Sequence, residues 1–295
     1  MPRHLGLDLG GTNVKAVVLD DSELVANATF PTDAPRGPRA VVDRLAEVAR
    51  WATDHHGPVE TIGLGVPGLF DPTDGRVLLF PNLPGPWSGY PLRARLEEEL
   101  GRPVHMINDA RAFTLAEGTV GAGAGCSTLV CVTLGTGIGG GVMIDGRLHL
   151  GAFGVAGEIA HQTVLPDGPL CGCGNRGCVE ALARSDVVAA AAGRPTVEQV
   201  YAGVAEGDDR CIGAVRGAAG WLGIALANVV AVLGPDRIVV GGGIASAGEL
   251  VLGPIRDAVR ARVTLVPTDR IEVVAASLGS YAGAIGAALA GIEAE

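Results

Sequence analysis

The stretch Leu7-Asp-Leu-Gly-Gly-Thr-Asn-Val-Lys-Ala-Val-Val-Leu-Asp20 aligns without a gap on Val132-Thr-Leu-Gly-Thr-Gly-Ile-Gly-Gly-Gly-Val-Met-Ile-Asp145. Each copy has an apolar strand, a glycine turn, a second apolar strand and an acidic turn. Residues 23–30 and 147–150 supply a third strand to each copy. Helical segments and a further strand follow later in both halves. The repeat therefore predicts a duplicated α/β unit.

The glycines in both turns bring backbone N–H groups within reach of an anion. One such turn alone is equally typical of an ordinary hairpin, but two copies in register favour a pair of phosphate loops that clamp one polyphosphate. The first copy carries Asp8 where the second has Thr133, so only the first offers a carboxylate for a hydrated Mg²⁺. Lys15, the only lysine of the chain, also lies in the first copy.

Two common nucleotide motifs are excluded. Gly135 to Gly140 matches G-x-G-x-x-G, but a strand-like run follows it, whereas a dinucleotide-binding fold requires a helix there. The chain has no G-x-x-x-x-G-K-[ST] motif, which excludes a P-loop protein.

A second motif predicts a closed tetrahedral zinc site. Its four candidate ligands are His161, Cys171, Cys173 and Cys178. The intervening glycines allow the tight turn that would direct three sulfurs to one point. Buried structural thiols or a disulfide are the alternatives, but C-x-C is too tight for an easy disulfide and three is an odd number. Glu158 and Glu180 flank the motif without being needed for the metal, which suggests a site for a polyhydroxy ligand.

Composition indicates a globular protein large enough for two domains around a shared cleft. The 295 residues are 48% hydrophobic, 18% charged and 4% aromatic. The net charge of −10 argues against a nucleic-acid surface. A strand-like run begins at Leu5, so we expect no signal peptide, and the Ala/Gly-rich run from Ala218 to Gly234 fits a core helix better than a membrane span. Free thiols without an export signal indicate the cytoplasm.

Local patterns predict further elements. Helices are expected at 40–51, 92–100 and 109–118, and strands at 61–66, 104–107, 237–240 and 271–275. Residues 67–89 are expected to form a long Pro/Gly-rich loop, either facing a substrate or merely solvated. Asn108 and Asp109 follow a strand, where open α/β sheets place ligands, although an Asp there is also typical of a helix N-cap.

The predicted N-terminal α/β domain covers residues 1–118, and a C-terminal helix at about 281–295 is expected to pack back on it. The predicted C-terminal α/β domain covers residues 119–280 and includes the zinc loop at 161–180.

With these motifs, the chain resembles the ROK family of sugar kinases over nearly its whole length, and most closely the family's bacterial glucokinases. The resemblance rests on residues 8–15, the Pro81-Asn-Leu-Pro-Gly85 loop, Asn108-Asp-Ala110, residues 134–141, and the E-x-x-H plus C-x-C-x4-C-x-E segment. It implies an actin-like ATPase, ribonuclease-H-like fold with ATP in the cleft between two domains. It also implies a homo-oligomer, a dimer or tetramer, with a hexose as substrate.

The resemblance also implies roles for particular residues. Asp109 is the general base for the sugar 6-hydroxyl, and Asn108 and Asp109 hold the far hydroxyls. Glu158, His161 and Glu180 hold the anomeric side, with Gly68 and Asn82 lining the same pocket. Asp8 holds Mg²⁺ through water. The residues expected to contact ATP are Gly10, Gly11, Thr12, Lys15, Thr136, Gly137 and Gly242.

A zinc ion with four protein ligands is expected to fix the loop that bears Glu180 and to activate nothing. Losing it should cost sugar affinity but leave nucleotide affinity much less changed, because the phosphate loops lie elsewhere in the sequence.

Three residues depart from the family's pattern. Ala160 replaces a usual glycine, and Arg111 and Phe113 stand where smaller residues are expected. We expect neither Arg111 nor Phe113 to touch an assigned catalytic group, although both are positioned to reshape the sugar pocket.

Several functions remain open. The alternatives are a kinase for N-acetylmannosamine, N-acetylglucosamine or fructose, a sugar-responsive repressor, and a non-catalytic sugar sensor. Seven residues before Asp8 are too few for a helix-turn-helix segment, and Asp8, Lys15 and Asp109 together argue against a sensor. The preference for ATP over polyphosphate also remains open.

Overall fold

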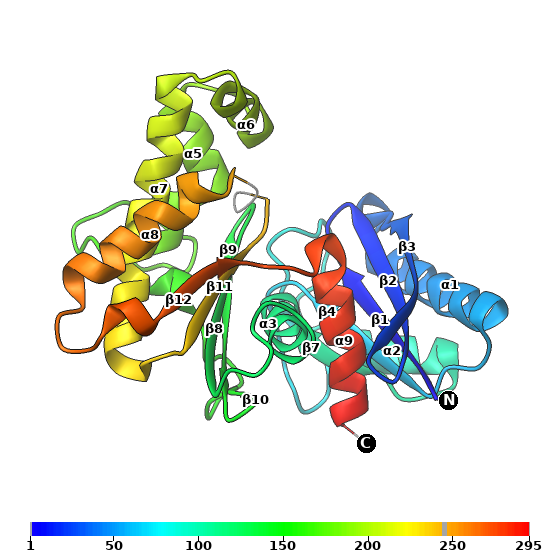
Figure 1. Cartoon of the computed structure of the whole chain (residues 1–295). Coiled ribbons are helices and arrows are strands. Elements are labelled where there is room, and N and C mark those ends of the chain that lie inside the picture. Colours follow the sequence, from blue (N-terminus) through cyan, green and yellow to red (C-terminus); the bar gives the residue numbers. More distant parts are fainter. Residues whose placement is uncertain (1, 244–246, 295) are drawn as a thin grey trace. The chain divides into compact units, whose positions relative to one another are not determined.

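The computed structural model describes residues 2–243 and 247–294, and the chain divides into two compact units (Figure 1). The first comprises Met1–Val120 together with Leu278–Glu295, and the second comprises Gly121–Ser277. The sequence-based boundaries at 118 and 280 lie two or three residues from this division.

The first unit is built on a mixed five-stranded sheet with the order β3-β2-β1-β4-β7. Its strands are β1 (Arg3–Leu9), β2 (Asn13–Asp20), β3 (Glu23–Pro31), β4 (Thr61–Val66) and β7 (His105–Asn108). The first three pair antiparallel, whereas β1, β4 and β7 pair parallel. The remaining elements are η1 (Ala34–Arg36), α1 (Pro38–His56), β5 (Leu69–Phe70), β6 (Val77–Leu79), α2 (Leu92–Leu100), α3 (Asp109–Thr119), η5 (Gly279–Tyr281) and α9 (Ala282–Glu293).

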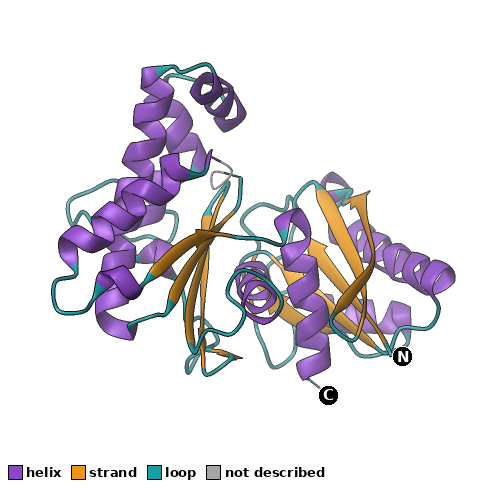
Figure 2. Ribbon diagram, viewed as in Figure 1, coloured by secondary structure: helices purple, strands orange, loops and turns teal. Residues whose placement is uncertain are grey.

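The second unit repeats this design with the sheet order β10-β9-β8-β11-β12. Its strands are β8 (Thr128–Leu134), β9 (Ile138–Ile144), β10 (Arg147–Leu148), β11 (Arg237–Gly241) and β12 (Glu272–Ala275). The other elements are η2 (Ile159–His161), α4 (Val179–Ala183), α5 (Ser185–Ala192), α6 (Val197–Ala205), α7 (Asp209–Leu233), α8 (Glu249–Arg262) and η4 (Thr268–Arg270). Both sheets consist of three antiparallel strands followed by two parallel ones, with helices packed beside them (Figure 2). The predicted duplication is confirmed.

The last helix, α9, packs on β1 and β4 of the first unit at very short range (Figure 1). A Cβ atom added at Gly6 would lie 1.9 Å from the carbonyl oxygen of Ala284, and one at Gly63 would lie 1.7 Å from that of Ala287. On the other side, a Cβ at Gly286 would lie 1.7 Å from the carbonyl oxygen of Ala112 in α3. Glycines at these contacts therefore determine how closely α9 approaches the sheet.

Helix α7 extends further than the predicted run at 218–234, because it begins at Asp209. By length and composition alone it is the one helix of the described residues that is long and apolar enough to cross a membrane. Its side chains at Leu222, Leu226 and Val230 are nevertheless buried in the hydrophobic core of the second unit, as expected of a core helix.

The segment at 67–89, expected to be a long loop, has more regular structure than its sequence indicates. It contains the β5–β6 hairpin, and its side chains at Leu83 and Trp87 are only 5% and 3% exposed in the core of the first unit. The segment is therefore anchored in the core of the first unit by a few apolar side chains, although most of its residues are exposed. The pattern is hidden in the sequence because apolar residues at irregular spacing carry no helical or strand period.

Candidate active site

The first glycine turn joins β1 to β2 and lies against a distant loop of the same unit. The turn is closed by the N–H of Gly10, which donates to the carbonyl oxygen of Asn13 at 2.9 Å. A Cβ at Gly11 would lie 2.8 Å from the carbonyl oxygen of Asn82. The fold therefore brings the predicted phosphate turn together with the Pro81–Gly85 loop, while Thr12 stays exposed at the tip.

Asp8 lies near the end of β1, opposite Lys15 on β2. Its carboxylate faces the first turn of α9, where a Cβ at Gly283 would come within 2.8 Å of Oδ2. Burial raises the pKa of Asp8, and the positive charge of Lys15 opposes that rise. The Lys15 ammonium also donates to the carbonyl oxygen of Ser280 at 2.7 Å, so it ties β2 to the segment that precedes α9.

Asn108 and Asp109 lie where β7 ends and α3 begins. The helix N-cap is Asn108, whose Oδ1 accepts from the N–H groups of Ala110 and Arg111 at 3.1 and 3.3 Å. Its Nδ2 donates to the carbonyl oxygen of Gly68 at 3.1 Å, which brings two predicted sugar-site residues together. The carboxylate of Asp109 accepts from the N–H of Ala110 at 2.8 Å, so it is held in the first turn of the helix.

Arg111 lies closer to the predicted site than expected. The side chain is only 4% exposed, and Nη1 donates to Oδ1 of Asn108 at 2.8 Å. The sequence did not reveal this contact with a predicted sugar-binding residue, which arises because the first turn of α3 places Arg111 three residues from the helix N-cap. Phe113 is buried, at 8% exposure.

The second glycine turn joins β8 to β9 and is anchored from two directions. The N–H of Gly135 donates to the carbonyl oxygen of Gly137 at 2.9 Å, and Thr136 is exposed at the tip. Gly242, the residue after β11, has a φ of 86°, and a Cβ there would lie 2.2 Å from the carbonyl oxygen of Leu134. The predicted nucleotide contacts of this unit are therefore neighbours in space.

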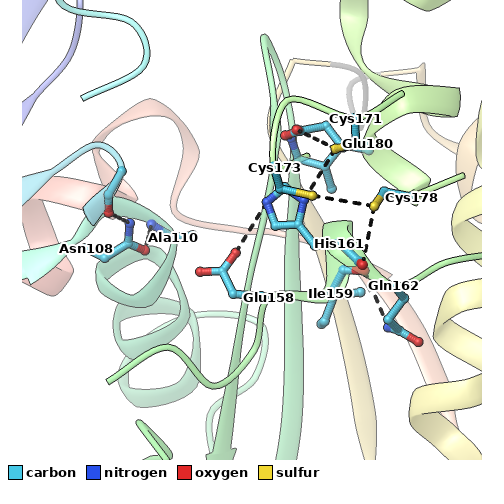
Figure 3. A network of polar contacts seen from close by, with 12 residues as sticks. Asn108, Ala110, Glu158, Ile159, His161, Gln162, Cys171, Cys173, Cys178 and Glu180 are labelled. Carbon is cyan, nitrogen blue, oxygen red and sulfur yellow. Dashed lines mark hydrogen bonds and ion pairs between the residues drawn. The ribbon is translucent and has the colours of Figure 1, made fainter. Parts of the chain in front are cut away.

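The candidate metal ligands gather as predicted. One ligand atom from each of His161, Cys171, Cys173 and Cys178 lies within 4.8 Å of every other (Figure 3). The Sγ atoms of Cys173 and Cys178 are 3.7 Å apart, and Sγ of Cys171 is 3.6 Å from Nδ1 of His161.

These distances fit a tetrahedral zinc ion. Two sulfurs bound to one zinc at about 2.3 Å are separated by about 3.8 Å, and a sulfur and a nitrogen by slightly less. The ring of His161 turns Nδ1 towards the sulfurs, while Nε2 lies 3.8 Å from Oε2 of Glu158 (Figure 3). A carboxylate beside the second ring nitrogen is the usual way to orient a histidine ligand.

The thiols differ in how readily they lose a proton. Burial raises the pKa of Cys178 to about 12 and also raises the pKa of Cys171. The backbone N–H of Asn175 lowers the pKa of Cys173. A metal that binds this cluster must therefore displace protons from Cys171 and Cys178.

Glu180 links this cluster to the second glycine turn. Its Oε1 lies 3.8 Å from Sγ of Cys171, and its Oε2 accepts from the N–H of Ile138 at 3.2 Å. The prediction that metal loss leaves nucleotide affinity much less changed was argued from distance in the sequence. In the fold the metal segment and the second glycine turn are in contact through Glu180, so distance in the sequence does not support it.

Ala160, the third departure, is 1% exposed in the hydrophobic core of the second unit. The extra methyl group is accommodated by core packing.

Two residues were missed by the sequence reasoning. The hydroxyl of Thr32 donates to the carbonyl oxygen of Gly10 at 2.7 Å, and that of Ser185 donates to the carbonyl oxygen of Gly135 at 2.5 Å. Each holds one of the two glycine turns. Neither carries a signal in the sequence, because a single hydroxyl after a strand or at a helix start is common.

Comparison with known proteins identifies the architecture. A profile of the ROK family matches residues 4–293. The chain is 35% identical to a glucokinase of Thermotoga maritima, covering 96% of this chain and 95% of the relative. A ROK hexokinase of Thermus thermophilus superposes with a TM-score of 0.86 at 38% identity, over 99% of this chain and 98% of that one.

A ROK family glucokinase of Streptomyces griseus, solved in complex with glucose and AMPPNP, superposes with a TM-score of 0.85 at 33% identity over 99% of both chains. Proteins with other functions are also similar. An N-acetylmannosamine kinase of Citrobacter koseri is 32% identical over 97% of each chain. A xylose repressor of Caldicellulosiruptor bescii is 27% identical, with 96% of this chain matching 76% of the repressor.

Proposed function

The chain belongs to the ROK family, and on that premise we propose that it is an ATP-dependent hexokinase that phosphorylates the 6-hydroxyl of glucose. The similarity to glucokinases over almost the whole chain supports this substrate. The relative that was solved with glucose and AMPPNP supports both ligands.

The observation that carries the proposal is the pair of carboxylates beside the metal cluster. Glu158 lies 3.8 Å from Nε2 of His161, and Glu180 lies 3.8 Å from Sγ of Cys171. A rigid cluster that holds two carboxylates and an imidazole offers several hydrogen-bond acceptors and donors to a ring of hydroxyl groups. We assign Glu158, His161 and Glu180 to the anomeric side of the sugar.

Residues of the first unit supply the reacting end. Asp109 would accept the proton of the 6-hydroxyl as it attacks the terminal phosphate, and Asn108 would hold the neighbouring hydroxyls with Gly68 and Asn82 beside it. Because phosphoryl transfer depends mainly on positioning and charge stabilisation, a carboxylate held at a helix start suits this role. Arg111 would act through Asn108, whose amide it fixes.

The two glycine turns would hold the nucleotide. We assign the contacts to Gly10, Gly11, Thr12, Thr136, Gly137 and Gly242, with Lys15 adding positive charge near the first turn. Asp8 would hold Mg²⁺ through water, and the ion would neutralise charge on the phosphates. Zinc would supply structural rigidity, held by His161 and the three cysteines.

Two other functions stay in competition. The similarity to N-acetylmannosamine kinases favours a kinase for another hexose, and the similarity to repressors favours a sugar-responsive regulator.

A coupled assay of ADP release separates these possibilities. Glucose, mannose, fructose, N-acetylglucosamine and N-acetylmannosamine are compared by kcat/KM at saturating Mg-ATP, and polyphosphate then replaces ATP with glucose as acceptor. We expect glucose to exceed each competitor, because a site built to pair hydroxyls penalises groups that leave its polar atoms unmatched. A higher kcat/KM for another sugar would support a kinase but contradict the glucokinase assignment. Sugar binding without turnover would favour the regulator.

A further inference from the structure

The two carboxylate oxygens of Glu180 contact different parts of the second unit. One oxygen, Oε2, accepts a hydrogen bond from the N–H of Ile138, and the other, Oε1, lies 3.8 Å from Sγ of Cys171 (Figure 3). Glu180 therefore lies between a candidate metal ligand and the backbone of the second glycine turn. A carboxylate that accepts a backbone N–H forms one of the stronger hydrogen bonds found in proteins.

The glycine at 137 makes this contact possible. A Cβ atom at that position would meet Oε2 of Glu180 at 2.9 Å and its Cδ at 3.9 Å, and among the described residues no other atom outside its chain neighbours lies within 4 Å. Of the side chains that the structure describes, Glu180 is thus the one that a methyl group at position 137 would displace.

The helix that carries Glu180 is fastened at both ends. Cys178 is the N-cap of the five-residue helix α4, which ends just before Arg184. The next residue, Ser185, donates both its N–H and its hydroxyl to the carbonyl oxygen of Gly135, at 3.2 and 2.5 Å. Residues 178–185 thus join a candidate metal ligand to the second glycine turn. A movement of Cys178 is therefore expected to move the turn as well.

We propose that Glu180 is a positioning residue for the second phosphate turn, so that the metal cluster determines nucleotide affinity as well as sugar affinity. This inference rests on the proposed function, because it takes the turn at Gly135–Ile138 to hold phosphate. Glu180 fixes the turn through Ile138, and helix α4, whose N-cap Cys178 is a candidate metal ligand, fixes Glu180. Nucleotide binding therefore depends on Glu180 even when no sugar is present.

Calorimetric titration with AMPPNP and Mg²⁺, without sugar, measures this dependence on the zinc-loaded protein. Glu180→Ala is expected to weaken AMPPNP binding on the order of 10–100-fold, the effect of losing one charge-assisted hydrogen bond. Glu180→Gln keeps an oxygen that accepts from Ile138 and should recover most of the affinity. Glu206→Ala is the matched control, since Glu206 is an exposed carboxylate at the end of α6 in the same unit; it should bind AMPPNP as the wild type does.

A double-mutant cycle tests the route of the effect. Gly137→Ala should weaken AMPPNP binding by displacing Glu180, whereas the same change in the Glu180→Ala background should cost little more. If Gly137→Ala weakens AMPPNP binding by the same factor in the wild type and in Glu180→Ala, the positioning role is refuted. Exchange of the Ile138 amide proton, followed by NMR, should be faster in Glu180→Ala and close to wild type in Glu180→Gln.

The outcomes distinguish this inference from the function on which it rests. A wild-type protein that binds no AMPPNP contradicts the proposed kinase. A wild type that binds AMPPNP, with Glu180→Ala binding it equally well at one zinc per chain, overturns the inference alone. If Glu180→Ala loses its zinc, Gly137→Ala is compared with the wild type instead, both at one zinc per chain. An unchanged AMPPNP affinity in Gly137→Ala would then overturn the inference.

Discussion

Thr32 donates its hydroxyl to the carbonyl oxygen of Gly10, the first glycine of the first turn. Gly135 occupies the equivalent position in the second copy, and it accepts from the hydroxyl of Ser185. Thr32 follows β3, whereas Ser185 begins α5. The two halves therefore hold equivalent carbonyl groups with hydroxyls from unrelated elements.

We expect Thr32→Val to destabilise the protein by about 1–3 kcal/mol, because it leaves the carbonyl of Gly10 without its buried donor. Urea unfolding measures the change, and the KM for ATP should rise with it. Thr53→Val is the control, since the exposed Thr53 donates a longer hydroxyl bond, at 3.2 Å, to the carbonyl of Ala49 within α1. Equal losses in the two variants would contradict a special role for Thr32.

Asp109→Asn should retain sugar binding but lose on the order of 10²–10⁴ in kcat, because the amide cannot take the proton of the 6-hydroxyl. Steady-state kinetics and a glucose titration measure the two properties separately. Asp43→Asn, an exposed change on α1, should leave both intact. Retention of more than half the wild-type rate by Asp109→Asn would remove it as the base.

Elemental analysis of protein purified in metal-free buffer should find one zinc per chain. Cys173→Ser should lose the metal and sugar affinity, because three ligands hold the ion less tightly than four. The link through Glu180 leads us to expect weaker AMPPNP binding as well. Cys126→Ser alters a thiol outside the cluster and should keep the zinc. Zinc-free wild-type protein with full activity would refute the structural role of the metal.

The pH profile should depend on Lys15. Its charge lowers the pKa of Asp8, which burial raises, so removing the charge lets Asp8 take up a proton at higher pH. If Mg²⁺ needs the ionised carboxylate, Lys15→Met should move the acidic limb of kcat/KM for Mg-ATP to higher pH. Lys15→Arg keeps the charge and should leave the limb near its wild-type position. If the acidic limb of the profile does not move in Lys15→Met, the proposal that ionised Asp8 holds Mg²⁺ is contradicted.

Much of the fold follows from patterns that are local in the sequence. The strand at Thr61–Val66 and the helix at Leu92–Leu100 were predicted with their observed bounds, because an apolar run and a Gly101 stop are local signals. Helix α1 extends beyond the prediction at both ends, from Pro38 to His56, since polar ends carry little periodicity.

The candidate site divides in the same way. The ligand spacing of the cysteines predicted the metal cluster, because a short glycine-rich segment leaves few other arrangements. The contact between Arg111 and Asn108 and the buried position of Trp87 were not predicted. Both features depend on how side chains from distant parts of the first unit pack together.

The sequence by itself determined the duplicated strand pattern, the two glycine turns and the four candidate metal ligands, because periodicity and ligand spacing are properties of short segments of the chain. Only the tertiary structure decided that Glu180 reaches Ile138 and that Thr32 reaches Gly10. Such contacts join residues far apart in the chain, and their formation depends on close packing of whole elements. No local pattern records that packing, since hydrogen bonds of this kind are selected by distance and direction in the folded state.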